Sequence, residues 1–283
     1  MPSVDYATKQ GNINVALPVY KRKEDESMRF TIQAACSCNK GKVRANNEDN
    51  FYFDGKSLPA ENNGLRNPVC FEDYIKHGLC HAVFDGMGGE NFGELASFAA
   101  AEYLRNTEKT LADYFVPEKK YLKELCNGMN KAVVDVAAEQ GTTRMGTTMV
   151  AFYYTSRYVY VCNLGDSRAF QLRSGVFAQV SQDHVESLED SDNARKRKPA
   201  LMQYLGIDPE EFLLEPYIIK AELKRGDKYL LCSDGLTDML SNVEISDILI
   251  AHDDVEECVE ALIQAALDKG GKDNVTVIVS KIC

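Results

Sequence analysis

The chain has 283 residues, of which 45% are hydrophobic, and a formal net charge of −11 at pH 7. This hydrophobic content is ample for a sizeable core, so we expect a globular protein of one large domain or two small ones. The negative charge argues against a general nucleic-acid binder, because phosphate backbones favour a basic face. No apolar stretch is long enough to span a bilayer and the N-terminus lacks a signal-peptide pattern, so we expect a cytoplasmic protein without a membrane anchor.

The nine cysteines also favour a cytoplasmic protein. They are scattered along the chain, and Cys36 and Cys38 are too close together for a zinc-binding pair. An odd number of thiols would be a hazard in an oxidising compartment. We therefore expect reduced, mostly buried cysteines.

The N-terminal part begins with a polar leader. Residues 1–28 carry mixed charges and need not be ordered throughout, and we expect a single domain over residues 29–283. Strand-like segments follow at residues 30–34 and 50–53. A turn-rich insertion at residues 54–67 holds several Asn, Gly and Pro residues and should lie on the surface.

The next apolar run, residues 79–84, predicts a buried strand that ends at Asp85 in a glycine-rich turn. Two long amphipathic helices are predicted after it. Apolar positions recur at helical spacing over residues 91–110 and again over residues 121–140.

The middle of the chain is rich in short β-branched and aromatic runs, which predict an antiparallel meander. Its strands are expected at residues 147–154, 158–163, 167–172 and 176–180. Arg173-Ser174-Gly175 is a plausible hairpin loop, with glycine where a positive φ is needed.

The C-terminal third predicts a further strand pair, two helices and a last strand. We expect them at residues 213–223, 228–232, 243–251, 255–269 and 275–282. A sheet-rich centre flanked by helix pairs favours a layered domain with helices on both outer faces.

A polar stretch at residues 181–211 contains Asp183-His184 and the basic run 195–198. Such runs are usually exposed surface loops. The alternative is that this loop overhangs the functional site and attracts a phosphorylated substrate.

Acidic residues recur at strand ends. Asp85, Asp166 and Asp234 each follow an apolar run, and Glu48-Asp49 and Asp273 add two further acidic sites. An Asp-Gly after one strand usually marks only a turn, but carboxylates gathered in one pocket repel one another unless cations are present. Hard oxygen ligands without thiolate or imidazole favour Mg²⁺ or Mn²⁺ over Zn²⁺.

Seven motifs in this chain resemble, in order, those of the metal-dependent PPM, or PP2C-like, serine/threonine protein phosphatases, and most closely the compact bacterial type. They are Arg44-x-x-Asn47-Glu48-Asp49, Asp85-Gly86-Met87-Gly88-Gly89, Gly146-Thr147-Thr148, Gly165-Asp166-Ser167-Arg168, Ser181-x-Asp183-His184, Ser233-Asp234-Gly235-Leu236-x-Asp238 and Asp273-Asn274-Val275-Thr276. The resemblance covers the chain from about residue 30 to its end. It implies an α+β fold, a four-layer α-β-β-α sandwich with two central antiparallel sheets.

The resemblance also implies roles for these residues. Asp85 would bridge two metal ions, with the Gly86 carbonyl and the Glu48-Asp49 pair serving the second ion and Asp234 and Asp273 the first. Asp166 and Asp238 would belong to a third, weaker site. Two dications about 3.5–4 Å apart lower the pKa of a bridging water enough to supply hydroxide near neutral pH. Arg44 would hold the phosphate oxygens with its planar fork of donors.

Two features concern the general acid. Many eukaryotic relatives have a histidine directly after the Asp-Gly, and here that position is Met87, which cannot protonate a leaving group. His184 has suitable chemistry, but a lone histidine is more often structural.

The function we predict is hydrolysis of phosphoserine and phosphothreonine in proteins, with Mn²⁺ or Mg²⁺ as cofactor. The substrates would be those of a serine/threonine kinase, and we expect a monomer. Two alternatives stay open: a PP2C-fold binding or regulatory module with little catalysis, and a hydrolase of small phosphoesters. Neither a Gly-x-Ser-x-Gly motif nor a cysteine phosphatase loop is present, so no covalent nucleophile is expected.

Overall fold

The computed structural model describes residues 30–88, 92–111, 117–186, 199–210 and 212–283. The predicted leader and the basic run 195–198 lie outside these residues. Within them, the strands form two sheets in which every pairing is antiparallel.

The first sheet has six strands in the order β3-β1-β12-β11-β8-β9. Their bounds are β1 Thr31–Asn39, β3 Val69–Tyr74, β8 Arg168–Arg173, β9 Val176–Gln179, β11 Lys228–Cys232 and β12 Val275–Ile282. The second sheet has the order β10-β7-β6-β4-β2, and the short β5 pairs with β4 beside this path. Its strands are β2 Asp49–Tyr52, β4 Leu79–Gly88, β5 Met145–Thr147, β6 Met149–Tyr154, β7 Tyr158–Leu164 and β10 Tyr217–Glu222.

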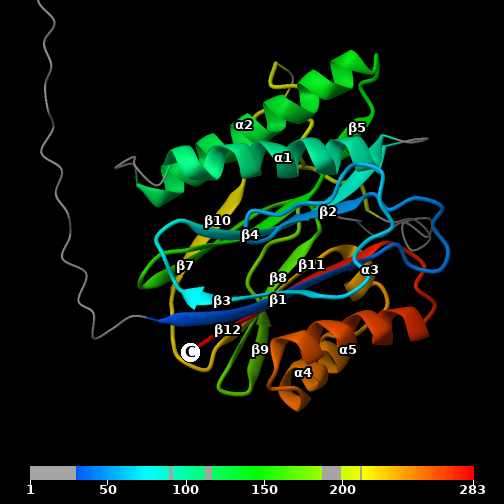
Figure 1. Ribbon diagram of the computed structural model, residues 1–283. Helices are drawn as coiled ribbons and strands as arrows, with labels where there is room; N and C mark the ends of the chain where they lie inside the picture. The colour runs from blue at the N-terminus through cyan, green and yellow to red at the C-terminus, as the bar shows by residue number, and fades with distance from the viewer. Residues whose placement is uncertain (1–29, 89–91, 112–116, 187–198, 211) are drawn as a thin grey trace, which may run out of the picture.

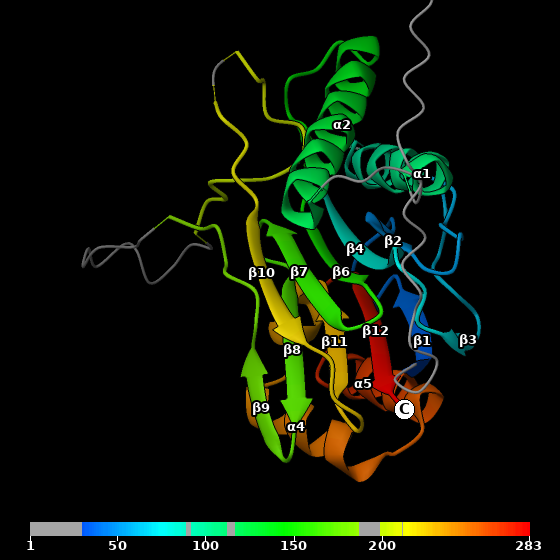
Figure 2. The same ribbon diagram turned by 90° about the vertical axis from the view of Figure 1, so that its left-hand side faces the viewer.

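Helices cover the outer face of each sheet (Figures 1 and 2). The helices α1 (Gly93–Leu111) and α2 (Glu118–Glu139) lie over the second sheet. The helices α4 (Asn242–Ala251) and α5 (Val255–Asp268) lie against the first sheet, and the short α3 (Asp234–Thr237) follows β11. The predicted α-β-β-α sandwich with two antiparallel sheets is therefore confirmed.

Local sequence explains where the C-terminal helices begin. Ser241 and Glu244 form a capping box at the start of α4, each side chain bonding to the backbone N–H of the other. The Asp254 side chain accepts hydrogen bonds from the N–H groups of Glu256 and Glu257 at the start of α5. Both helices therefore start where their sequence satisfies the first free N–H groups.

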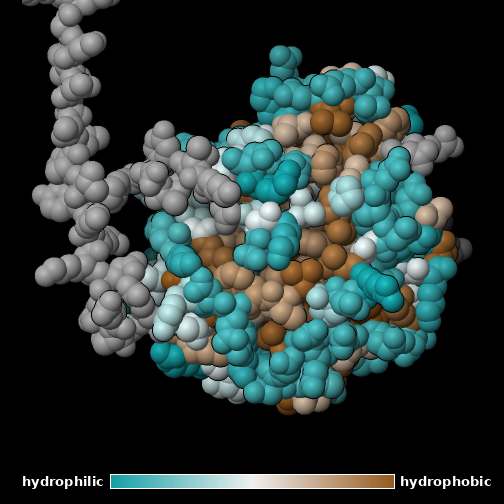
Figure 3. All heavy atoms as spheres, in the orientation of Figure 1, coloured by the Kyte–Doolittle hydropathy of each residue, from teal (hydrophilic) through white to brown (hydrophobic). Residues whose placement is uncertain are grey.

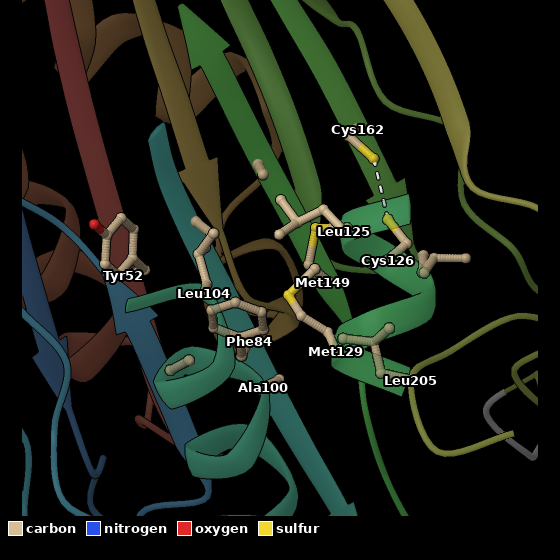
Figure 4. Close-up of a cluster of buried hydrophobic side chains, with 14 of the residues drawn as sticks. Tyr52, Phe84, Ala100, Leu104, Leu125, Cys126, Met129, Met149, Cys162 and Leu205 are labelled. Atoms are coloured by element: carbon tan, nitrogen blue, oxygen red, sulfur yellow. Dashed lines mark hydrogen bonds between the residues drawn. The ribbon is translucent and has the colours of Figure 1, made fainter. Parts of the chain in front are cut away.

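Buried side chains fill three layers, and β4 shows why its residues 82–84 are all apolar. Ala82 and Phe84 belong to the cluster that packs under α1 and α2 (Figure 4), whereas Val83 belongs to the cluster between the two sheets. Because alternate residues of a strand face opposite sides, a strand covered on both faces has apolar residues at every position. The third cluster lies between the first sheet and α4 and α5.

The predicted single meander is wrong. The four middle strands exist, and Ser174 and Gly175 form the hairpin loop between β8 and β9 with φ of 51° and 80°. However, β6 pairs with β7 in the second sheet, whereas β8 and β9 belong to the first. The chain crosses between the sheets after Leu164, because each sheet needs apolar strands facing the other across the core.

The predicted pairing between the strands at residues 213–223 and 228–232 is also wrong. The first strand, β10, pairs with β7, and the second, β11, lies between β8 and β12 in the other sheet. The edge strand β3 was not expected from the sequence. Its alternating half-buried and exposed residues fit an edge position.

The cysteines fit the expectation of mostly buried thiols. All nine are free, and all except Cys70 and Cys283 are buried. Cys126 and Cys162 lie with their sulfur atoms 3.6 Å apart beneath α2 (Figure 4).

The distribution of hydrophilic and hydrophobic side chains on the surface follows the layers of the fold. Figure 3 shows hydrophilic side chains over the outer helices, with hydrophobic ones in the middle of this face between the two helical layers. The insertion at residues 54–67 is mostly exposed or half-buried, as predicted, although Leu58 packs into the core between the sheets. In the described part of the chain, no helix has the length and apolar character needed to cross a membrane.

A buried histidine makes the stability of this core dependent on pH. His81 is fully buried between the sheets, its Nδ1 lies 3.2 Å from Ser280 Oγ, and its ring lies 4.7 Å from the ring of Phe53, centroid to centroid. Burial lowers the pKa of His81 to about 3. The unfolded chain therefore binds a proton below its ordinary pKa of about 6.5 that the folded chain does not bind.

We predict that this difference destabilises the protein as the pH falls. Between about pH 7.5 and about pH 5, His81 should account for a loss of about 2 kcal/mol in the free energy of unfolding. The measurement is urea unfolding across this range for wild type and His81→Phe, with the exposed histidine variant His77→Gln as control. If wild type and His81→Phe lose stability in parallel as the pH falls, the account of His81 is wrong.

Candidate metal and phosphate site

Asp85 lies inside a strand, which corrects the predicted turn. The strand β4 continues through Asp85 to Gly88, and its last residues pair with β5. Gly86 is needed for close packing: a Cβ atom there would lie 2.0 Å from the Gly93 carbonyl oxygen and 2.6 Å from the Glu48 carbonyl oxygen. The glycine therefore lets α1 and the segment before β2 approach the strand beside Asp85.

The Gly146-Thr147-Thr148 motif fixes the backbone of Asp85. The carbonyl oxygen of Asp85 accepts hydrogen bonds from Thr147 Oγ1 and the Thr148 N–H, both at 2.9 Å. The Asp85 N–H donates to Thr148 Oγ1, which also lies 2.7 Å from Ser167 Oγ. These bonds hold Asp85 in place relative to the end of β7, where Asp166 follows.

Asn274 fixes the backbone of Glu48. Its Oδ1 accepts a hydrogen bond from the Glu48 N–H at 2.8 Å, and its Nδ2 donates to the carbonyl oxygens of Lys40 and Asn46. Asn274 is buried and directly follows Asp273. The segment that carries Arg44 and Glu48 is thus tied to the residue next to Asp273.

Asp49 connects the two sheets under the site. It lies opposite Asp85 in the pairing of β2 with β4. Its Oδ2 accepts hydrogen bonds from Ser233 Oγ and Thr276 Oγ1, both at 2.7 Å. Both donors belong to the half of the sandwich that contains the first sheet. Burial raises the pKa of Asp49 to about 7, while the two hydroxyl donors act in the opposite direction.

Most of the predicted site residues line one pocket of about 310 Å³. Five carboxylates face it, together with the Arg44 guanidinium and residues of the Asp85 strand. These residues are Arg44, Glu48, Asp85, Gly86, Met87, Gly88, Thr148, Asp166, Asp234 and Asp273, with Pro199 and Leu201 at its edge. Seven chain segments that are far apart in sequence meet here.

Arg44 is the basic residue among those lining the pocket, and it pairs with one carboxylate. Its Nη2 lies 2.6 Å from Asp273 Oδ2, and both side chains are partly exposed, at 50% and 28%. Burial, followed by repulsion from Glu94, raises the pKa of Glu48. The five carboxylates that line the pocket therefore outnumber the one arginine that lines it.

The donor set fits hard divalent cations. Carboxylate and carbonyl oxygens line the pocket, and no cysteine or histidine does so among the described residues. In the same part of the chain, no three acidic, histidine or cysteine side chains are close enough to enclose an ion by themselves. The chemistry of these oxygen atoms, and not their spacing, is what suits Mg²⁺ or Mn²⁺.

Three sequence-predicted residues lie outside this pocket. Asp49 is buried beneath it, and Asp238 is exposed at the C-terminal end of α3. His184 is half-buried, and its Nδ1 accepts a hydrogen bond from the Gly165 N–H at 3.3 Å. Burial lowers the pKa of His184, which keeps the ring neutral. Its contacts are those of a structural histidine.

The Ser181-x-Asp183-His184 motif forms an ion pair and a hydrogen bond that stabilise the motif containing Asp166. Asp183 forms a two-pronged ion pair with Arg168, with its Oδ2 2.6 Å from Nη2 and 3.0 Å from Nε. Ser181 Oγ accepts the N–H of Ala169. The sequence identified these motifs but not their structural role. Their contacts hold the loop of Asp166 in place and do not reach the pocket.

The lining also includes residues that sequence reasoning did not single out. Pro199 and Leu201 reach the pocket from the polar stretch at residues 181–211, which agrees with the alternative that part of this loop overhangs the site. Thr148 was noted only as part of a motif. No local pattern in the sequence marks these three positions as neighbours of Asp85.

The fold and the pocket together define a class of protein, a metal-dependent hydrolase built on an α-β-β-α sandwich. Residues 70–275 match the family model described as Protein phosphatase 2C. The chain belongs to the protein phosphatase 2C family.

Two bacterial phosphatases are among the proteins similar to this chain. The chain is 31% identical over 261 residues to the serine/threonine phosphatase stp of Listeria innocua, covering 87% of this chain and 94% of that protein. It is also 31% identical to the serine/threonine protein phosphatase PstP of Mycobacterium tuberculosis, over 89% of this chain and 45% of that protein.

Solved structures of this family share the fold. The M. tuberculosis phosphatase PstP superimposes with a TM-score of 0.69 at 27% identity, covering 89% of this chain and 98% of that one. A PstP catalytic domain in complex with two manganese ions gives a TM-score of 0.66 at 28% identity, covering 89% and 99%.

We predict that Gly86→Ala disturbs the site because the added methyl group meets backbone atoms that cannot move aside. The free energy of unfolding should fall by about 1–3 kcal/mol or more. Gly128→Ala is the comparison: its methyl group would lie 2.0 Å from Tyr103 Oη and 2.7 Å from Cε1, but it meets a side chain that can turn away and not backbone, so the loss of stability should be smaller. Denaturant unfolding measures both, and a Gly86→Ala protein as stable as wild type would contradict the packing argument.

Proposed function

We propose that the pocket around Asp85 is the active site of this enzyme. As a member of its family, the chain is a metal-dependent serine/threonine protein phosphatase, which hydrolyses phosphoserine and phosphothreonine in proteins. The observation that carries the assignment to this pocket is the meeting of five carboxylates and one arginine from distant segments.

The pocket suggests which residues hold the cations. Asp85 would be the shared ligand, with Glu48 and the Gly86 carbonyl holding one ion and Asp234 and Asp273 the other. Asp166 would serve a third, weaker site. Asp49 acts one layer below by holding Ser233, the residue before Asp234. Asp238, which lies outside the pocket, would contribute to the third site only if a side chain or loop moves.

Two bound Mn²⁺ or Mg²⁺ ions would supply hydroxide near neutral pH and stabilise the charge on the phosphoryl group. Arg44 binds the phosphate oxygens, for which its planar guanidinium is suited. In the structure its partner is Asp273. Binding of a cation by Asp273 would weaken this ion pair and free Arg44 for the substrate.

The lining supports direct attack by water on phosphorus. Thr148 is the hydroxyl-bearing residue of the described lining, and its Oγ1 already bonds with the Asp85 N–H and with Ser167. It is therefore poorly placed to act as a nucleophile. Met87 lines the pocket but has no proton to give, so the leaving group takes its proton from water.

Other aspects of the proposal follow from the fold. The pairing of β1 with β12 joins the first described strand to the last, which supports a single domain over residues 29–283. The free thiols support work in a reducing compartment. We also propose that the substrates are proteins phosphorylated by a serine/threonine kinase and that the enzyme is a monomer.

We predict that activity depends on Asp85 and on a divalent cation. Phosphate release from phosphothreonine and phosphoserine peptides should require Mn²⁺ or Mg²⁺ and stop with chelator. Asp85→Asn should lower kcat/KM on the order of a hundredfold or more, because it removes one negative charge from the shared ligand. Asp247→Asn, which changes an exposed carboxylate on α4, is the matched control and should behave as wild type.

A phosphotyrosine peptide tests the substrate class in the same assay and should be a poor substrate. Hydrolysis that persists in chelator, or an Asp85→Asn protein with wild-type kinetics, would refute the proposed site.

A further inference from the structure

A second and larger pocket lies directly beside the first. Its volume is about 600 Å³, and the polar residues that line it are Asn46, Asn47, Glu61, Asn62, Asn63 and Glu94. One chain segment forms part of both walls: Arg44 and Glu48 face the site around Asp85, whereas Asn46 and Asn47 face the second pocket. A ligand in one pocket is therefore separated from the other only by this segment.

The polar lining of the second pocket offers acceptors that lack donors. Asn47 is 1% exposed and Glu94 is 9% exposed, and Asn47 Oδ1 and Glu94 Oε2 have no hydrogen-bond partner in the described structure. Buried oxygen atoms without a donor are unfavourable by about 1–3 kcal/mol each. Both residues line the pocket, but the two oxygen atoms are themselves buried, so each side chain must turn slightly to meet a donor-rich group bound there.

The charge of the pocket indicates a cation. Glu61 and Glu94 both line it, no lysine or arginine does so among the described residues, and Glu94 also repels Glu48 in the adjacent site. A positively charged group would relieve this repulsion and donate to the free oxygens.

The size of the pocket and its apolar lining indicate what kind of cation it binds. The volume is far larger than a single ion needs, and Ala45, Ala60 and Leu95 add apolar surface to the lining. Lysine and arginine place an apolar stem along such surface and a charged, donor-rich head beyond it.

We propose that this pocket, which we call the Glu94 pocket, binds a lysine or arginine side chain of the substrate protein close to the phosphorylated residue. The inference rests on the proposed function of the Asp85 site, since it concerns the substrate of that site. It assigns a sequence preference to the enzyme: basic residues near the phosphoserine or phosphothreonine favour hydrolysis.

The backbone between the pockets is held in a way that suits this role. Asn274 bonds to both the Glu48 N–H and the Asn46 carbonyl oxygen, and Asn47 Nδ2 donates to Asn62 Oδ1 at 2.7 Å. The wall is thus fixed to Asn274, the residue before β12, on one side and to the insertion at residues 54–67 on the other. This assigns the insertion a part in substrate selection.

The test is a set of phosphothreonine peptides with Mn²⁺. In a parent peptide with alanine around the phosphothreonine, lysine replaces each flanking alanine in turn, and glutamate does so in a parallel set. At one or two positions, lysine should raise kcat/KM about fivefold or more over the parent, and glutamate should lower it.

Two variants locate the effect. Glu94→Gln removes the buried charge, and Glu61→Lys reverses a charge at an exposed position, where folding should be unaffected. Each should reduce the ratio of kcat/KM between the lysine peptide and the parent to near one. Glu260→Gln, an exposed charge removal on α5 in the opposite helical layer, is the matched control and should keep the wild-type ratio.

The outcomes separate the two proposals. If the parent peptide is not hydrolysed with Mn²⁺, the proposed function fails and this inference fails with it. If the parent is hydrolysed but lysine gives no advantage, or if the advantage survives in both variants, only the Glu94 pocket is refuted. A Glu94→Gln protein that keeps the lysine preference and instead needs a different Mn²⁺ concentration would also overturn it, because the pocket would then serve an ion.

Discussion

The repulsion among the carboxylates around Asp85 is the constraint on which the rest of the structure depends. Glu48, Asp85, Asp166, Asp234 and Asp273 face one pocket, and Arg44, which also lines it, forms an ion pair with Asp273. Bringing like charges together is unfavourable unless cations compensate. The fold must therefore hold these side chains in place by contacts that do not depend on their attraction for one another.

Buried polar groups supply those contacts. Thr147 and Thr148 fix the backbone of Asp85, Asn274 fixes that of Glu48, and Asp49 ties Ser233 to the opposite sheet. Each of these bonds joins segments that belong to different strands or sheets. The bonds of Asn274 and Asp49 run from residues beside β2 to residues beside β11 and β12, so these two also hold the two halves of the sandwich together.

The sequence predicted the chemistry of the site, and the structure was needed to see how its residues are held in place. The carboxylates are recognisable because oxygen ligands with this spacing have few other uses, and their order along the chain matches that of a known family. The role of Asn274 was not predictable, because its hydrogen bond to Glu48 joins residues 226 positions apart. Likewise, strand patterns identified β7, β8, β10 and β11 but could not say which sheet each joins, since pairing is decided by the packing of both faces. The glycine at position 86 indicated a turn, whereas it permits close packing within a strand.

The Glu94 pocket was also invisible in the sequence, because three segments form it and no motif contains them all. Its place beside the Asp85 site suggests how a strongly acidic enzyme selects among phosphoproteins. The net charge of −11 repels phosphate groups in general, and a basic residue next to the phosphate would offset that repulsion at the point of binding.

The central claim, that the Asp85 pocket is a two-metal centre, is tested most directly by anomalous diffraction from crystals grown with Mn²⁺. The account predicts two anomalous peaks about 4 Å apart on either side of the Asp85 carboxylate, with Arg44 no longer paired with Asp273. A map with no peak in this pocket, or with manganese bound elsewhere and the Arg44–Asp273 pair intact, would contradict it.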